Sequence, residues 1–193
     1  MRMDQSAKLT AEDVVNNASE EELVRIIREY GEEKQAYRIV QEILSVRASK
    51  PIKTTGELSA IIENVVKANP KFVVKSKARV FQALRIHVND ELGVLKKMLV
   101  DAVNILNPGG ALVIITFHSL EDKLVKDFFK YEEKECLCPS TFPACRCDKV
   151  SRLKILTKKP IVACEQELNE NRRSRSAKLR VAIKRRWGSD ESN

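Results

Sequence analysis

Apolar residues recur with helical spacing through the first third of the chain. In three segments the apolar positions fall at i, i+3, i+4 and i+7, the pattern of an amphipathic helix with one buried face. The segments are residues 19–30, 36–44 and 54–68. The first opens on a capping-box pattern, Ser-Glu-Glu-Glu. We therefore expect a small helical subdomain over residues 10–69.

The pattern weakens and then returns in the middle of the chain. Residues 71–79 are basic and poorly patterned, so we expect a hinge there. From Val80 the helical spacing resumes and continues to Leu106, as one long helix or as two with a break near Gly93. The sequence Pro-Gly-Gly at 108–110 then stops the helix, because proline cannot continue it and glycine adopts the left-handed backbone of a helix end.

The second half of the chain has the pattern of an α/β fold. Residues 111–115 form an unbroken apolar run, typical of a strand that is buried on both faces in a parallel sheet. A helix is expected over 120–129, and residues 153–157 are a short candidate strand. Residues 177–184 alternate strictly between polar and apolar, which predicts a half-exposed, antiparallel strand near a sheet edge.

Four polar residues follow the apolar strand, at the place where open α/β sheets bind ligands. They are His118, Ser119, Glu121 and Asp122, and we take them as candidates for a catalytic pocket. A second interpretation stays open: Ser119 caps the next helix, and the two acids lie at its N-terminus, where the helix dipole favours negative charge. The sequence does not identify a catalytic base.

Charge and composition narrow the class of partner. The chain of 193 residues carries a net charge of +8 with a pI near 9.3, which favours a polyanionic partner without proving one. No apolar run approaches the roughly 18 residues of a membrane span, and no signal peptide is visible. We expect a cytoplasmic protein that does not enter a membrane and whose cysteines are reduced.

Arginines supply the best candidates for RNA contact. Guanidinium groups make bidentate contacts to phosphate, and residues 171–176 hold three of them beside two hydroxyls. The alternative is a basic turn that keeps the strand end soluble. Arg85 and Asn89 share a helix face at i and i+4 and could face substrate together or pair with their neighbours. The candidate RNA-binding set is Arg79, Arg85, Asn89, Arg172, Arg173 and Arg175.

Cysteines form two Cys-x-Cys pairs within twelve residues. Cys136, Cys138, Cys145 and Cys147 would suffice for a tetrahedral zinc site. The usual zinc spacing is wider than Cys-x-Cys, so the pattern favours a loop of reduced cysteines that holds no metal. Both interpretations stay open. The remaining Cys164 is expected to be a small buried residue.

Several sequence blocks together resemble a known family. They are FQALRIHVNDEL at 81–92, NPGG at 107–110, FHSLED at 117–122 and NRRSRSAKLR at 171–180, with YGEE at 30–33. Taken together, in the order in which they occur along the chain, these blocks resemble the bacterial methyltransferase H family of small-subunit ribosomal RNA. The resemblance implies transfer of a methyl group from S-adenosylmethionine to N4 of a decoding-site cytidine. It also implies a Rossmann-like class I methyltransferase fold with an inserted helical subdomain.

The resemblance divides the chain into parts. Residues 1–75 correspond to most of the helical insert and 76–187 to the C-terminal part of the catalytic domain. The latter contains a cysteine-rich loop at 132–150, and residues 188–193 form a tail. None of the six glycines has the spacing of a glycine-rich cofactor turn, and the strand at 111–115 has no parallel partner. We therefore expect a C-terminal fragment that offers no cofactor-binding residues of its own.

These patterns are consistent with several partners and with two other functions. The expected partner is small-subunit rRNA or the ribosomal subunit, and either a homodimer or a companion N-terminal segment could complete the sheet. The chain could instead be a non-enzymatic RNA-binding protein or a zinc-binding interaction module.

Overall fold

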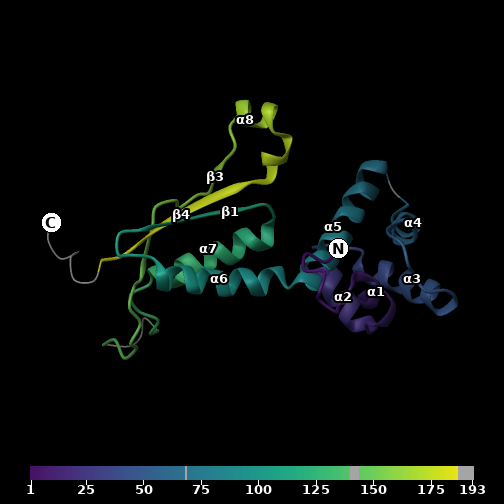
Figure 1. Ribbon diagram of the computed structural model, residues 1–193, viewed down its shortest axis with the longest axis horizontal. Helices are drawn as coiled ribbons and strands as arrows, with labels where there is room; N and C mark the ends of the chain where they lie inside the picture. The colour runs from purple at the N-terminus through teal and green to yellow at the C-terminus, as the bar shows by residue number, and fades with distance from the viewer. Residues whose placement is uncertain (68, 140–143, 187–193) are drawn as a thin grey trace. The chain divides into compact units, whose positions relative to one another are not determined.

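The computed structural model describes residues 1–67, 69–139 and 144–186 (Figure 1). Their contacts divide the chain into two compact units, Met1–Glu91 and Leu92–Asn193. The division expected from the family resemblance, at residue 75, refers to the domains of the methyltransferase and stays a prediction. The expected tail at 188–193 lies outside the described residues. No described helix is both long enough and apolar enough to cross a bilayer.

The first unit is a bundle of helices around one apolar core. The predicted helices at 19–30, 36–44 and 54–68 are confirmed, and a short helix that the apolar spacing did not predict precedes them. The core draws on every helix, with Leu23, Ile39 and Ile62 among its fully buried members. The elements are α1 (Ala11–Asn17), α2 (Glu20–Glu29), α3 (Ala36–Ser49), α4 (Thr55–Val66) and α5 (Pro70–Asn89).

Side-chain caps begin four of these helices, α1, α2, α4 and α5. Thr54 Oγ1 accepts from the Glu57 amide at 3.1 Å, and the Glu57 carboxylate accepts from the Thr54 amide at 3.0 Å. This reciprocal pair satisfies two amides that lack helical partners. The predicted cap at Ser19 is also present, with its hydroxyl 3.2 Å from the Glu22 amide.

The predicted hinge at 71–79 is wrong, because these residues lie inside α5. Asn69 accepts from the Lys71 amide at 3.0 Å, and Pro70 occupies the first helical turn, where its missing amide has no cost. The Asn69-Pro70 dipeptide, which the sequence marked as the stop of the preceding helix, therefore also begins α5. Val73, Ser76 and Val80 form the buried face, and the basic residues between them hid this period in the sequence.

Glu33 and Gly31 explain how closely α5 approaches α2. A Cβ atom on Gly31 would lie 2.6 Å from the Ile27 carbonyl and 2.8 Å from the Arg79 carbonyl, so only glycine fits. Beside it, the buried Glu33 carboxylate accepts from the Ser76 hydroxyl at 2.9 Å. The segment 30–33 thus serves the packing of the first unit.

The second unit combines helices with a small antiparallel sheet. The helical segment is interrupted at Asp90, which separates α5 from α6 and has a φ of +46°. This interruption lies three residues before the expected position near Gly93. The predicted strand, helix and two later strands are confirmed. The elements are α6 (Glu91–Ile105), β1 (Ala111–Thr116), α7 (Ser119–Glu133), β2 (Leu153–Ile155), β3 (Ile161–Val162), α8 (Glu165–Glu170), the 3₁₀ helix η1 (Arg172–Ser176) and β4 (Lys178–Lys184).

The strand β4 is the centre of the sheet, so its predicted place near an edge is wrong. One side of β4 pairs with β1, and the other side pairs with β2 and β3 at its two ends, always antiparallel. The register places Ile115 opposite Leu179 and Val113 opposite Val181. Among the described residues, β1 pairs with β4 alone, which leaves the other edge of β1 open.

The sheet is covered on one face. Helices α6 and α7 lie along that face (Figure 1), where Leu112 and Ala182 pack with Leu99, Val125 and Phe129. On the other face Val113 and Ile115 are 51% and 55% exposed. The prediction that residues 111–115 are buried on both faces is therefore wrong for this structure, because nothing in the described chain covers the second face.

The predicted stop after α6 is confirmed, and it is tied to the end of β4. Gly109 has a φ of +83°, and its amide donates to the Lys184 carbonyl at 2.8 Å. The ammonium of Lys184 in turn donates to the Leu106 carbonyl at 2.7 Å, beside the last turn of α6. These bonds fix where β1 starts relative to β4.

Candidate functional site

The strongest candidate site is the junction where β1 ends and α7 begins. Thr116 closes the strand with a buried side chain, and its hydroxyl donates to the Lys178 carbonyl at 3.3 Å. Phe117 follows and is 57% exposed. His118 is the N-cap of α7, and Ser119, Glu121 and Asp122 lie in its first turn, so three of the four predicted pocket residues come from one helical turn.

His118 caps α7, which corrects the expectation that Ser119 does so. The Nδ1 atom of His118 accepts from the Glu121 amide at 3.4 Å. In return the Glu121 carboxylate accepts from the amides of Phe117 and His118, at 2.8 Å and 3.3 Å. Ser119 is the first residue of the helix, and its side chain is exposed. A histidine fills the role that a serine or threonine usually has.

This geometry sets the chemistry of His118 and Glu121. Because Nδ1 accepts, the hydrogen of a neutral imidazole lies on Nε2. That buried atom lies 3.3 Å from Glu121 Oε1 but makes no hydrogen bond among the described residues. Burial would raise the pKa of Glu121, yet the His118 side chain and the backbone amides together lower the pKa. The pair therefore places an ionised carboxylate beside a buried N–H group.

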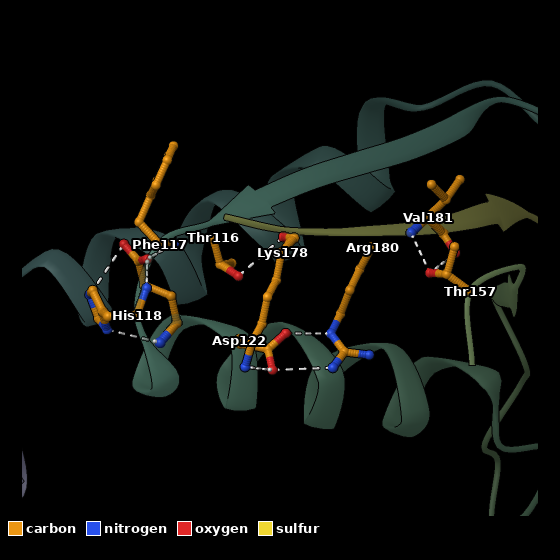
Figure 2. A network of polar contacts seen from close by, with 9 residues as sticks. Thr116, Phe117, His118, Asp122, Thr157, Lys178, Arg180 and Val181 are labelled. Atoms are coloured by element: carbon orange, nitrogen blue, oxygen red, sulfur yellow. Dashed lines mark hydrogen bonds and ion pairs between the residues drawn. The ribbon is translucent and has the colours of Figure 1, made fainter. Parts of the chain in front are cut away.

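Asp122 is held by two basic residues of β4 (Figure 2). Its Oδ1 accepts from Arg180 Nε at 2.6 Å, and its Oδ2 accepts from Arg180 Nη2 at 3.2 Å and from Lys178 Nζ at 3.3 Å. The Arg180 hydrogen bond is the main reason that the pKa of Asp122 is lowered, while burial opposes the shift. Asp122 thus anchors α7 to the sheet, and its place in a substrate pocket stays a prediction.

Arg180 and Lys178 were missed as site residues by the sequence analysis. The alternating pattern of 177–184 suggested that the charged side of β4 faces solvent, but Arg180 is only 6% exposed. A signal was present in α7, where Asp122 and Glu132 share a helix face with Val125 and Phe129. A carboxylate on an apolar helix face is costly to bury unless it is paired, so basic side chains are expected on the layer that packs against this face.

A second buried ion pair holds the far end of α7. The Glu132 carboxylate, 2% exposed, accepts from Arg152 Nε and Nη2, both at 2.6 Å. The third nitrogen of that guanidinium, Nη1, donates to Asn104 on α6 at 3.0 Å.

The end of the sheet is held by a side-chain hydrogen bond. The Thr157 hydroxyl accepts from the Val181 amide at 2.8 Å, at a point beyond the pairing of β2 with β4 (Figure 2).

The three arginines of η1 are exposed, as an RNA contact requires. Asn171 caps this short helix by accepting from the Arg173 amide at 3.1 Å, and Ser174 is buried beneath it. Within the part of the chain that the structure describes, Arg172, Arg173 and Arg175 form no ion pair. Their guanidinium groups are therefore available to phosphate.

The other RNA candidates already have partners inside the first unit. Arg85 makes a bidentate contact to Glu91, at 2.7 Å and 3.0 Å. The Asn89 amide bonds to the backbone of Met1, Met3 and Arg85. Arg79 lies 3.6 Å from the buried Glu33 carboxylate. These contacts support the alternative that Arg85 and Asn89 pair with neighbouring residues. RNA binding by Arg79, Arg85 and Asn89 stays a prediction.

The structure brings the two Cys-x-Cys pairs together. The sulfur atoms of Cys136, Cys138, Cys145 and Cys147 all lie within 4.8 Å of one another. Cys164 stands apart as the residue before α8, and the expectation that it is buried is wrong, because it is exposed.

Comparison with known proteins shows what the chain is similar to. The MraW methylase family matches residues 1–185. A ribosomal RNA small subunit methyltransferase H of Clostridioides difficile is 52% identical over 95% of this chain and 60% of its own length. Proteins of the same name from Caldicellulosiruptor saccharolyticus and Carboxydothermus hydrogenoformans are each 53% identical over 95% of the chain.

The chain spans about 60% of the length of these curated relatives. The match nevertheless runs through both units, from the first helix to the last strand. The resemblance seen in the sequence blocks is thereby confirmed, and the chain belongs to the MraW methylase family.

Proposed function

We propose that this chain is the C-terminal part of an S-adenosylmethionine-dependent methyltransferase that modifies N4 of a cytidine in small-subunit rRNA. The observation that carries the proposal is the identity of about one half, over 95% of the chain, to proteins named ribosomal RNA small subunit methyltransferase H. The cytidine and its N4 atom come from the resemblance of the sequence blocks. Such a protein would work in the cytoplasm, where its ribosomal partner is.

The open sheet supports the view that this chain is one part of a larger domain. Among the residues that the structure describes, one edge of β1 has no pairing strand, and proteins normally pair or cover such an edge. The open face carries Val113, Ile115 and Phe117, each more than half exposed. We propose that the remaining part of the methyltransferase adds a strand to this edge and covers this face.

The junction residues fit a pocket for the target base. Methylation of an exocyclic amine requires the base to leave its stack and lie against the methyl donor. His118 lies at the end of β1 with a buried Nε2 group that makes no hydrogen bond among the described residues, Glu121 bonds to the backbone of the turn, and Asp122 ties α7 to β4. The S-adenosylmethionine site would lie mostly outside this chain. The cofactor would supply the methyl group, and the residues here would orient the amine that receives it.

Complementation tests the proposal. The companion is the part of the Clostridioides difficile relative that lies outside the matched region. By calorimetry, the chain alone should bind S-adenosylmethionine no better than millimolar, about −4 kcal/mol. With the companion, both tight binding and transfer of a radiolabelled methyl group to small ribosomal subunits should appear.

Two outcomes would contradict the proposal. Micromolar binding by the chain alone would place the cofactor site within it. A stable homodimer that excludes the companion would show that a second copy occupies the open face instead. Size-exclusion chromatography of the same samples distinguishes the dimer from the complemented complex.

The arginines of η1 distinguish RNA recognition from surface charge. Replacing Arg172, Arg173 and Arg175 with Ala should weaken RNA binding and flatten its salt dependence, because fewer counterions are released. The matched control removes three exposed charges elsewhere in the unit, with Lys123→Ala, Lys130→Ala and Lys154→Ala. Equal losses in the two triple variants would mean that the effect comes from net charge and that η1 is not a specific contact.

If RNA binding persists while methylation never appears on complementation, the chain is a non-enzymatic RNA-binding protein. Among the described residues the edge of β1 is unpaired, which favours the enzyme, because such an edge is expected where another part of a larger sheet adds a strand.

A further inference from the structure

A separate cluster of sulfur atoms lies in the loop between α7 and β2, away from the proposed base pocket. The Sγ atoms of Cys136 and Cys145 are 3.3 Å apart, those of Cys145 and Cys147 are 3.5 Å apart, and those of Cys147 and Cys136 are 3.7 Å apart. Cys138 completes a group in which every sulfur lies within 4.8 Å of the others. Two short Cys-x-Cys turns therefore face each other.

The geometry points to a structural zinc site, and we propose that Cys136, Cys138, Cys145 and Cys147 together bind one zinc ion. Four sulfur atoms about 2.3 Å from a central zinc form a tetrahedron with edges of about 3.8 Å. The three separations among Cys136, Cys145 and Cys147, 3.3–3.7 Å, approach that value, and those to Cys138 are within 4.8 Å. The Cys-x-Cys spacing favoured a loop without a metal, and the convergence of all four side chains reverses that preference.

Backbone amides point at the sulfur atoms, as they do where thiolates must be stabilised. The amides of Leu137, Cys138 and Arg146 donate to Cys147, Cys136 and Cys138 respectively, each at 3.3 Å. Hydrogen bonds to sulfur favour the ionised form, which is the form that binds a metal. Each donor lies on one of the two Cys-x-Cys turns, so the turns orient their own ligands and support those of the other turn.

The loop needs such a tie because it has no core of its own. Among the described residues, none between 134 and 152 belongs to the apolar cluster of the second unit. In Figure 1 the loop extends away from the sheet and helices. Its base is closed by the Arg152 amide, which donates to the Glu132 carbonyl at 2.9 Å, and by the Ser151 hydroxyl, which donates to Glu133 at 2.8 Å. A zinc ion would join the two Cys-x-Cys turns farther out in this loop.

Metal analysis of the purified chain tests the site directly. Prepared under reducing conditions with zinc in the growth medium, the chain should contain about one zinc ion per molecule. Substitution with cobalt should give the intense visible bands of a tetrahedral site and the near-ultraviolet bands of thiolate-to-cobalt charge transfer. This spectrum reports on the four sulfur ligands and does not depend on methyltransferase activity.

Single variants connect the metal to these residues. Cys136→Ser and Cys147→Ser should each lose most of the bound zinc, and Cys164→Ser is the matched control that should keep it, because this exposed cysteine lies outside the cluster. A chelator should lower the melting temperature of the original chain and of the control, but not that of Cys136→Ser.

The proposal is overturned if the chain holds well under one zinc and gives no cobalt spectrum while its four thiols react freely. It is also overturned if the four cysteines are recovered as two disulfides from reducing buffer. Zinc that survives in both Cys→Ser variants would place the metal elsewhere.

Discussion

The two units of the molecule differ in how completely each buries its own apolar surface. Among the described residues, nineteen buried hydrophobic side chains form the core of the first unit, and they come from all of its helices. The corresponding core of the second unit has seven, and one face of its sheet stays open. Burial of apolar surface is the main stabilising term in folding, so the first unit is the more self-sufficient.

The second unit contains buried ion pairs within its core. Its core contains two carboxylates, Asp122 and Glu132, each held by an arginine from the C-terminal part of the chain. Ion pairs of this kind add little net stability over apolar packing, but they are costly to break and fix which surfaces meet. The comparison teaches that the helical unit is organised around its own core, whereas the sheet unit leaves one edge of β1 unpaired and one sheet face exposed among the described residues.

The largest expected effect comes from breaking the pair at the centre of the sheet unit. Asp122→Ala leaves Arg180 buried without its partner and should cost about 3–5 kcal/mol. Asp127→Ala, an exposed acid on the same helix, should change stability by less than about 0.5 kcal/mol. Urea denaturation gives the free energies, and hydrogen exchange should assign the loss to the second unit.

The double variant Asp122→Leu with Arg180→Met sharpens this prediction. Because it removes both charges, it should recover most of the lost stability. A double variant as unstable as Asp122→Ala would show that the packing of Asp122 matters more than its charge.

A comparable test of the helical unit is an apolar truncation. Leu23 is fully buried, so Leu23→Ala should cost about 2–5 kcal/mol through lost transfer energy and a cavity. Arg28→Ala on the exposed face of the same helix is the control. If hydrogen exchange showed protection falling equally in both units, the comparison between a self-sufficient unit and an incomplete one would fail.

Acid should weaken the sheet unit through Asp122. The pKa of Asp122 is lowered in the folded state, mainly by Arg180, so its contribution to stability is present above its ordinary value of 3.8. That contribution is lost as the pH falls through the lower, folded-state pKa. Asp122→Asn should remove this part of the pH dependence, which thermal melts across the acid range can measure. An unchanged pH profile would show that other carboxylates govern acid unfolding.

The smallest effect is expected on the open face of the sheet. Ile115 is 55% exposed, so Ile115→Thr keeps a β-branched side chain and should change the stability of the chain by less than about 0.5 kcal/mol. On the proposed function, the same variant should nevertheless weaken complementation by the part of the Clostridioides difficile relative that lies outside the matched region. Val150→Thr, at an exposed apolar residue outside the sheet, is the control. A large loss of stability without the companion would mean that this face is already covered.

The sequence by itself determined the features that depend on neighbouring residues. Apolar spacing located α2, α3 and α4, and the Pro-Gly-Gly turn located the start of β1. The polar cluster at 118–122 was recognised as a strand-to-helix junction, and several short blocks sufficed to identify the family. Each of these signals, including every sequence block used for the family, is a short stretch of neighbouring residues.

Only the tertiary structure decided the features that depend on a distant partner. The alternation of β4 shows that two faces differ, but not that the face with Arg180 is the buried one, because Asp122 lies 58 residues away. The same holds for the two Cys-x-Cys turns, whose spacing along the chain does not reveal that their sulfurs converge. Burial is fixed by what packs against a residue, and a one-dimensional pattern does not contain that information.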